Sequence, residues 1–267
     1  MRQKPPASRT CAGKYNKKAM KTFRLIRSKP SGAAYNMALD EDIFARYLED
    51  GVPVFRVYGW SGPAFTYGVS GKPERAIDIA RCSLDCLGVA KRMTGGGALF
   101  HYNEITYSLA CGKDDIDEPA DVFVSYRKIC GFLISFYRSI GLEASFALET
   151  EDFLKRSAPS DLCSVSCEKY DIVINGKKIG GNAQKRKRGA VFQHGSIPIS
   201  IDWEFVRRYA PSLPKDIASR VTTLSEELSH VPDKIALEEK LIASASDAFG
   251  ARFTEEKECF YEAGMVK

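Results

Sequence analysis

The sequence lacks the features that mark several protein classes. No apolar run approaches the 18 residues that suggest a membrane-spanning helix, and Arg127 and Lys128 interrupt the best candidate, residues 122–137. The first residues contain no apolar block of the kind that a secretory signal carries. No internal repeat is visible, and only three histidines occur in 267 residues. These absences exclude a membrane span and argue against export. The small number of histidines also argues against a metal site built from several histidines.

The eight cysteines do not form a disulfide or zinc framework. Without a secretory signal, we expect reduced thiols and a cytoplasmic location. Cys82 and Cys86 are separated by three residues, as are Cys163 and Cys167, whereas zinc ribbons use a spacing of two. We therefore predict no metal site, and expect most of these cysteines to serve as small core residues.

Acidic residues are absent from the first 39 positions, which contain ten Lys and Arg residues. Residues 40–267 carry 29 basic and 34 acidic residues, so the net charge of +5 belongs to the N-terminal segment. The acidic body argues against a nucleic-acid-binding protein. We predict that residues 1–19 are a basic, disordered tail, with a transit peptide as the alternative, and that residues 20–267 form one domain. Met20 is an alternative start, because the residues that follow it read as the first strand.

The apolar periodicity predicts an α/β (α+β) fold, with a mixed, mostly antiparallel sheet flanked by helices. Helices are expected at residues 33–50, 75–87, 119–141, 202–209 and 233–249. Strands are expected at residues 21–28, 53–60, 64–69, 89–93, 104–111 and 142–148. Three consecutive antiparallel strands then follow at 170–176, 177–184 and 190–200, with turns at Asn175–Gly176 and at residues 185–189.

The segment KRMTGGGALFH, residues 91–101, concentrates unusual residues in one turn. Ordering three consecutive glycines costs backbone entropy, which is tolerated where φ must be positive or where a ligand approaches the backbone closely. Lys91 and Arg92 just upstream indicate an anionic or strongly polar ligand, and His101 follows the turn. A plain hairpin turn is the alternative interpretation.

Lys178 lies within an apolar strand, next to a glycine pair. Neighbouring side chains of a strand point to opposite faces, so one of Lys177 and Lys178 faces the core side. An ammonium group on that side needs an anionic or carbonyl partner. The alternative is an edge lysine whose ammonium group reaches solvent.

Other motifs also have competing interpretations. Cys163, in the loop before this strand, would become a nucleophile if a nearby lysine lowered its thiol pKa, and otherwise is an inert thiol. Cys167 competes for that role. The run KRKR at 185–188 reads as a solvated hairpin tip or as a nucleic-acid patch, and His194, in the motif QHGS, as a structural hydrogen-bonding residue.

Taken together, KRMTGGGALFH with ITYS, YDIVINGKKIGGNAQ with QHGS, and YNMALDE near the start resemble the lipoate–protein ligase and octanoyltransferase family. That family shares its catalytic fold with biotin–protein ligases, and the resemblance covers roughly residues 21–250. It implies a lipoyl-type acyl group lying along the glycine loop, with Lys178 contacting the acyl carbonyl. It implies Cys163 and Lys178 as catalytic residues. The substrate-binding residues that it implies are Arg92, Thr94, Gly95, Gly96, Gly97, His101, Gly181, Asn182, Ala183 and His194.

Three features favour an octanoyltransferase that moves an octanoyl or lipoyl group from acyl carrier protein, through a cysteine thioester, to a lysine of a lipoyl carrier domain. Little chain follows residue 250, the segment NEITYS resembles the bacterial octanoyltransferases, and Cys163 falls where those enzymes carry their nucleophile. The implied acceptors are the glycine cleavage H protein and the E2 subunit of 2-oxoacid dehydrogenases. No cofactor, nucleic acid or membrane is implied.

Two alternatives stay open. An ATP-dependent lipoate–protein ligase, including the catalytic chain of a split ligase, would form lipoyl-AMP with ATP and Mg²⁺; the glycine triplet is common among ligases. The segment CSVSCE at 163–168 also departs from the C-F-x-x-P-S pattern of the transferases. A non-catalytic module that binds lipoyl groups or their carriers is the weaker alternative.

Overall fold

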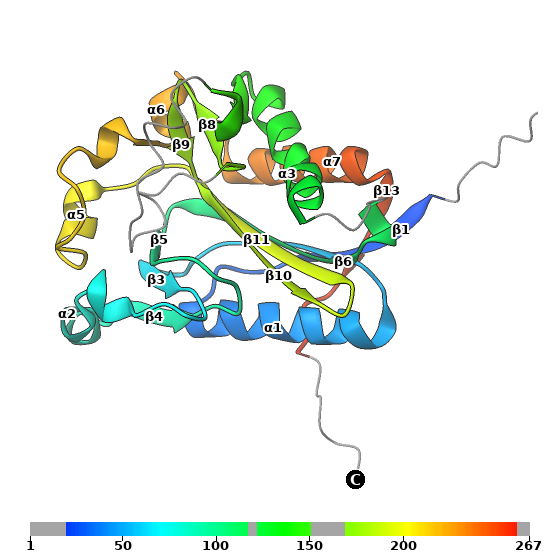
Figure 1. Ribbon diagram of the computed structural model, residues 1–267, viewed down its shortest axis with the longest axis horizontal. Coiled ribbons are helices and arrows are strands. Elements are labelled where there is room, and N and C mark those ends of the chain that lie inside the picture. Colours follow the sequence, from blue (N-terminus) through cyan, green and yellow to red (C-terminus); the bar gives the residue numbers. More distant parts are fainter. Residues whose placement is uncertain (1–19, 117–121, 151–168, 261–267) are drawn as a thin grey trace, which may run out of the picture.

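The computed structural model describes residues 20–116, 122–150 and 169–260, which form three β-sheets and the helices that cover them (Figure 1). The strands are β1 (Lys21–Arg27), β2 (Val54–Tyr58), β3 (Ala64–Tyr67), β4 (Gly88–Lys91), β5 (Leu99–His101), β6 (Glu104–Gly112), β7 (Ala144–Phe146), β8 (Ile172–Ile174), β9 (Lys177–Ile179), β10 (Gly181–Lys187), β11 (Ala190–Pro198), β12 (Val221–Thr222) and β13 (Ala251–Glu256). The α-helices are α1 (Ala33–Asp50), α2 (Ile79–Leu84), α3 (Val122–Ser139), α5 (Trp203–Arg207), α6 (Leu224–Glu227) and α7 (Lys234–Phe249).

The largest sheet has the strand order β10-β11-β6-β2-β1-β13. A four-stranded sheet has the order β12-β9-β8-β7, and a three-stranded sheet has the order β4-β3-β5. Parallel pairs occur at β1–β13, β1–β2, β12–β9 and β3–β4, and the other pairings of the described strands are antiparallel. The mixed, mostly antiparallel arrangement is the one that the periodicity predicts.

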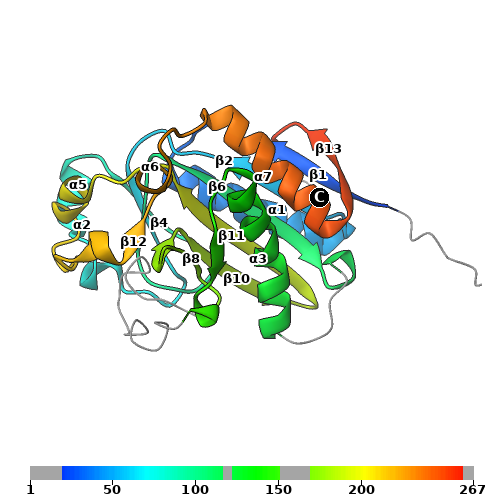
Figure 2. The same ribbon diagram turned by 90° about the horizontal axis from the view of Figure 1, so that it is seen from above.

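Helices cover both faces of the large sheet (Figures 1 and 2). Helix α1 lies against one face, and its buried residues recur every three or four positions, which is the spacing of one helical face. Helices α3 and α7 pack side by side over the other face. Because both faces are covered, the central strands β6 and β11 are buried along almost their whole length instead of alternating with solvent.

The ends of the helices agree with their sequence signals. Gly51 ends α1 with a left-handed backbone at φ 67°, and its N–H bonds to the carbonyl of Tyr47. Asp233 begins α7 by accepting a hydrogen bond from the N–H of Ala236, and Gly250 ends it at φ 57°. These capped helices fix the layer on each side of the sheet.

The structure corrects three details. Residues 177–184 are not one strand, because Gly180 turns the chain at φ 69° and separates β9 from β10, which lie in different sheets. The next turn is shorter than residues 185–189: β10 continues to Lys187, and only Arg188 and Gly189 have positive φ. After the last expected helix, where the sequence predicts no strand, β13 follows α7 and pairs in parallel with β1.

Some of the sequence predictions concern residues that lie outside the described part of the chain. The tail predicted for residues 1–19, together with Cys163 and Cys167, lies outside the described residues. Within them, no helix is long and apolar enough to cross a membrane. No group of three or more His, Cys, Asp and Glu side chains in that same part of the chain is placed to hold a metal ion.

Candidate functional site

A cavity opens where the ends of β2, β6 and β11 meet the small sheet β4-β3-β5 and the turn between β9 and β10. Apolar and aromatic side chains make up much of its wall, and a few polar groups converge on it. The residues that line it are Met37, Tyr58, Trp60, Thr66, Arg92, Leu99, His101, Thr106, Lys178, Gly181, Asn182, Ala183, His194, Gly195 and Ser196.

Lys178, like Arg92, is a buried cation that lines this cavity. It lies in β9 with only 6% of its surface exposed, whereas neighbouring Lys177 is half-buried. Its Nζ lies 2.7 Å from Oδ2 of Asp171, which is itself 3% exposed. The alternation of the strand predicted one core-side lysine that needs a partner, and Lys178 is that residue. Asp171 was not singled out in the sequence, although it directly precedes the apolar strand β8.

Arg92 holds the glycine loop in shape. Its Nη2 donates to the carbonyl oxygens of Gly95 and Gly97, both at 2.8 Å, and its Nε donates to Gly95 at 3.2 Å. The loop also packs closely on Gly68, whose N–H bonds to the carbonyl of Gly96 at 3.1 Å. The planar guanidinium presents its Nε and Nη2 donors in a fixed fork, so both can donate to the carbonyl of Gly95, a geometry that a lysine ammonium does not provide. Arg92 is only 4% exposed and lines the cavity.

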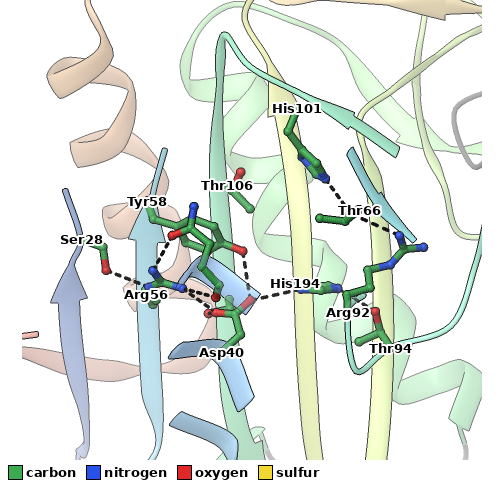
Figure 3. A network of polar contacts seen from close by, with 12 residues as sticks. Ser28, Asp40, Arg56, Tyr58, Thr66, Arg92, Thr94, His101, Thr106 and His194 are labelled. Atoms are coloured by element: carbon green, nitrogen blue, oxygen red, sulfur yellow. Dashed lines mark hydrogen bonds and ion pairs between the residues drawn. The ribbon is translucent and has the colours of Figure 1, made fainter. Parts of the chain in front are cut away.

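Two carboxylate–histidine–threonine chains stand beside the cavity, and Figure 3 shows the first between α1 and the glycine loop. Asp40 accepts from Arg56 at 2.8 Å and from Tyr58 at 3.0 Å, and lies 3.3 Å from Nδ1 of His194. The other ring nitrogen of His194 lies 2.7 Å from Oγ1 of Thr94. This chain therefore ties the loop to α1.

In the second chain, Glu104 lies 2.9 Å from Nδ1 of His101. Nε2 of His101 lies 2.8 Å from Oγ1 of Thr66 (Figure 3). Thr66 also accepts from Arg92 at 3.3 Å. The imidazole of His101 stacks on Trp60 with ring centroids 4.0 Å apart. Both histidines are thus oriented by a carboxylate on one side and bound to a threonine on the other.

The electrostatics of these chains follow from burial and close partners. Burial opposes ionisation of Asp40, but the hydrogen bond from His194 and the charge of Arg56 keep the pKa of Asp40 below its usual value. For His194, burial lowers the pKa more than Asp40 raises it. His194 is therefore neutral near pH 7, so Nδ1–H faces the carboxylate and Nε2 accepts from Thr94.

The structure brings most of the predicted catalytic and binding residues together. Seven of them line the cavity: Arg92, His101, Lys178, Gly181, Asn182, Ala183 and His194. Thr94, Gly95, Gly96 and Gly97 do not line it; they form the loop behind Arg92, with Thr94 buried and Gly95 and Gly96 exposed. The predicted nucleophile, Cys163, lies outside the described residues.

Sequence reasoning missed other parts of the wall. Tyr58 ends β2, Thr66 lies in β3 and Trp60 lies between these strands, and nothing in their local pattern distinguishes them from core residues. Met37 and Asp40 belong to the singled-out motif YNMALDE, but the pattern did not show that Met37 faces a cavity and Asp40 a histidine. The resulting site suits an apolar chain whose polar end lies near a buried ammonium group.

Comparison with known proteins supports this interpretation. Residues 32–246 match the family described as the lipoyl protein ligase A/B catalytic domain. The chain is 34% identical to octanoyltransferase LipM of Kyrpidia tusciae over 246 residues, which cover 87% of this chain and 89% of that protein. It is 31% identical to octanoyltransferase LipM of Clostridioides difficile, with 93% and 94% covered.

Solved structures share the fold. A crystal structure of lipoate–protein ligase A bound with ATP superposes with a TM-score of 0.74 at 21% identity, covering 89% of this chain and 90% of that one. A bipartite lipoate protein ligase from Thermoplasma acidophilum, studied with its E2 lipoyl domain, gives a TM-score of 0.71 at 20% identity, covering 90% and 88%. At these identities the likeness establishes the arrangement of elements.

Proposed function

The chain belongs to the lipoyl protein ligase A/B catalytic-domain family, with octanoyltransferases among its relatives, and we propose that it transfers an octanoyl group to lipoyl carrier domains. The donor is octanoyl–acyl carrier protein, and the acceptor is a lysine of a carrier such as the glycine cleavage H protein or an E2 subunit. The observation that carries the proposal is the buried Lys178 at an apolar cavity, in a chain whose full-length relatives are octanoyltransferases.

The proposed reaction has two steps. The Cys163 thiolate attacks the carbonyl carbon of the donor thioester, a new C–S bond forms, and the carrier thiolate leaves. The acceptor lysine amine then attacks the enzyme thioester, a C–N bond forms, and the Cys163 thiolate leaves as the amine loses a proton. Each step passes through a tetrahedral intermediate with negative charge on oxygen.

The roles of the described residues follow from their positions. Lys178, held beside Asp171, lies where it can polarise the acyl carbonyl or handle the amine proton. The apolar wall around Met37 and Trp60 receives the octanoyl chain. Arg92, His101 and His194 keep the wall and the glycine loop in place through the contacts described above.

The proposed transfer requires no cofactor, because it exchanges a thioester for an amide and needs no ATP. A nucleophilic cysteine must stay reduced, which fits a cytoplasmic location. An ATP-dependent ligase would instead start from free octanoate or lipoate and require ATP with Mg²⁺.

The test supplies the full-length chain with octanoyl–acyl carrier protein and an apo lipoyl domain, without nucleotide. The account predicts an octanoyl amide on the acceptor lysine, read as an added octanoyl mass on that domain. A matched reaction replaces the donor with free octanoate, ATP and Mg²⁺. Product from the second mixture alone would replace the transferase proposal with the ligase.

A further inference from the structure

Five polar side chains from neighbouring strands form a continuous row on the face of the large sheet that α3 covers. Across β10 and β11, Asn182 is paired with Gly195 and Gln184 with Gln193; across β11 and β6, Gly195 is paired with Tyr107. Positions two apart share a face, so these pairs lie one above the other. The row ends at Arg186, two residues beyond Gln184, in the basic run at the hairpin.

Hydrogen bonds connect the row from end to end. Nη2 of Arg186 donates to Oε1 of Gln184 at 3.1 Å, and Nε2 of Gln184 donates to Oε1 of Gln193 at 2.6 Å. Nε2 of Gln193 then donates to the hydroxyl of Tyr107 at 2.5 Å, and that hydroxyl donates to Oδ1 of Asn182 at 2.7 Å.

The direction of this chain is fixed by its first member. A guanidinium has only donors, so Gln184 must present its oxygen to Arg186 and its NH₂ to Gln193. Gln193 likewise accepts from Gln184 and donates to the Tyr107 hydroxyl, and that hydroxyl gives its single proton to Oδ1 of Asn182. Asn182 therefore turns its oxygen to Tyr107, and its NH₂ group is the donor left at the end.

Two further contacts hold Asn182 in this position. The hydroxyl of Tyr126 donates to the backbone carbonyl of Asn182 at 2.9 Å. A Cβ at Gly195 would overlap Oδ1 of Asn182 and the ring of Tyr107, so glycine is required for the contact between them. Asn182 is also a wall residue of the cavity that contains Lys178, and no described residue accepts from its NH₂ group.

We infer that the NH₂ group of Asn182 is a catalytic hydrogen-bond donor to the acyl oxygen, oriented by the row that begins at Arg186. This inference rests on the proposed function. In both proposed steps the carbonyl oxygen gains negative charge as the new bond to carbon forms, and loses it when the C–S bond breaks. A donor that is held in place before the reaction stabilises that charge without reorganising. Tyr107, Gln193, Gln184 and Arg186 are positioning residues.

The kinetic test compares Asn182→Asp, Asn182→Ala and Tyr107→Phe in octanoyl transfer. Asn182→Asp removes the donor, and we expect kcat to fall by about 10²–10³-fold with little change in KM. Tyr107→Phe lets the amide rotate and should give a smaller fall in kcat. Tyr137→Phe is the matched control, because it removes another buried tyrosine hydroxyl outside the row, and its kcat should stay within about twofold of the wild type.

A spectroscopic readout separates a donor from a residue that only shapes the cavity. In the octanoyl-enzyme labelled with ¹³C at the carbonyl, the stretching frequency should rise in Asn182→Ala, which loses the hydrogen bond, and rise less in Tyr107→Phe, which weakens it. An unchanged frequency, or a raised KM with unchanged kcat, would overturn the inference.

The orientation of the amide has a test that needs no turnover. Asp at position 182 keeps an oxygen for the Tyr107 hydroxyl, so Asn182→Asp should unfold at nearly the wild-type temperature. A large loss of stability would contradict the orientation even if the wild-type enzyme transferred nothing. Absence of transfer by the wild type contradicts the proposed function, whereas normal transfer by Asn182→Ala contradicts this inference alone.

Discussion

The ammonium nitrogen of Lys178 lies 2.7 Å from a carboxylate oxygen of Asp171, and both side chains are almost fully buried. Two charges removed from water need close partners to offset their desolvation. The turn at Gly180 makes the pair possible, because it ends β9 directly after Lys178 and Ile179 and lets β10 start in another sheet. The lysine is thereby held in place before any substrate arrives.

Asp171→Asn tests this pair. It keeps the shape of the side chain but leaves the Lys178 ammonium without its carboxylate, and we expect a loss of about 3 kcal/mol in the free energy of unfolding. Denaturant titration measures it. Asp216→Asn, which removes an exposed carboxylate bound to Arg220, is the control and should change stability far less, because water screens an exposed ion pair. Equal losses of unfolding free energy in the two variants would show that the buried pair contributes no more to stability than the exposed one.

Gly68→Ala tests the packing beneath the glycine loop. The added Cβ would overlap the carbonyl oxygen of Gly96 and the backbone of Gly95, which are not flexible side-chain ends. The loop must move, so octanoyl transfer should fall by at least about tenfold, the equivalent of ~1.4 kcal/mol. Gly62→Ala is the matched control, since its Cβ would meet nothing within 4 Å. Equal activity of the two variants would rule out the tight fit.

His194 predicts how stability depends on pH. Burial lowers the pKa of His194 in the folded protein below that of an unfolded histidine, about 6.5. Below that pH the unfolded chain binds a proton that the folded chain does not. Stability should therefore be lost as the pH falls from about 6.5 towards the lowered pKa, with a slope of up to about 1.4 kcal/mol per pH unit.

Unfolding titrations between pH 5 and pH 7.5 measure this slope. His194→Gln should flatten it, whereas His230→Gln, which alters an exposed histidine, should leave it as in the wild type. An unchanged slope in His194→Gln would mean that another group is responsible.

Met37 tests where the acyl chain lies. It packs with Ala33, Tyr58, Trp60 and Ala64 in a cluster at the α1 side of the cavity, and is 5% exposed. Met37→Ala should open space there and raise the ratio of kcat/KM for decanoyl over octanoyl donors by about tenfold, since each methylene is worth ~1–3 kcal/mol in an apolar pocket.

Met93→Ala is the control for Met37→Ala. Met93 is equally apolar and buried but is not among the lining residues, so its loss should reduce stability without altering the preference for chain length. If both variants shifted the preference for chain length, the effect would come from a general loosening of the core and not from the position of Met37 in the cavity.

The sequence predicted the parts of this molecule that local patterns determine. The spacing of apolar residues locates α1 and α7, Gly51 sits at the left-handed end of its helix, and the strand alternation predicts that one of Lys177 and Lys178 faces the core side. Each of these depends only on residues a few positions apart.

What the sequence did not predict depends on contacts between distant segments. Asp171 is a site residue because it contacts Lys178 across a hairpin. Asp40 is one because it contacts His194, which is 154 positions away. The segment that forms β13 is too polar to be predicted as a strand, because β13 lies at the sheet edge and most of its side chains are exposed or half-buried. Its strand conformation depends on pairing with β1. Gly180 reads as part of a strand until its positive φ is known.

The central claim is that an octanoyl group passes through a thioester on Cys163. Intact-mass measurement of the full-length enzyme after incubation with octanoyl–acyl carrier protein tests it most directly. The account predicts one octanoyl adduct on the wild type and on Cys167→Ser, and none on Cys163→Ser. An enzyme that forms no adduct, yet lipoylates its acceptor when given free acid and ATP, would contradict the account.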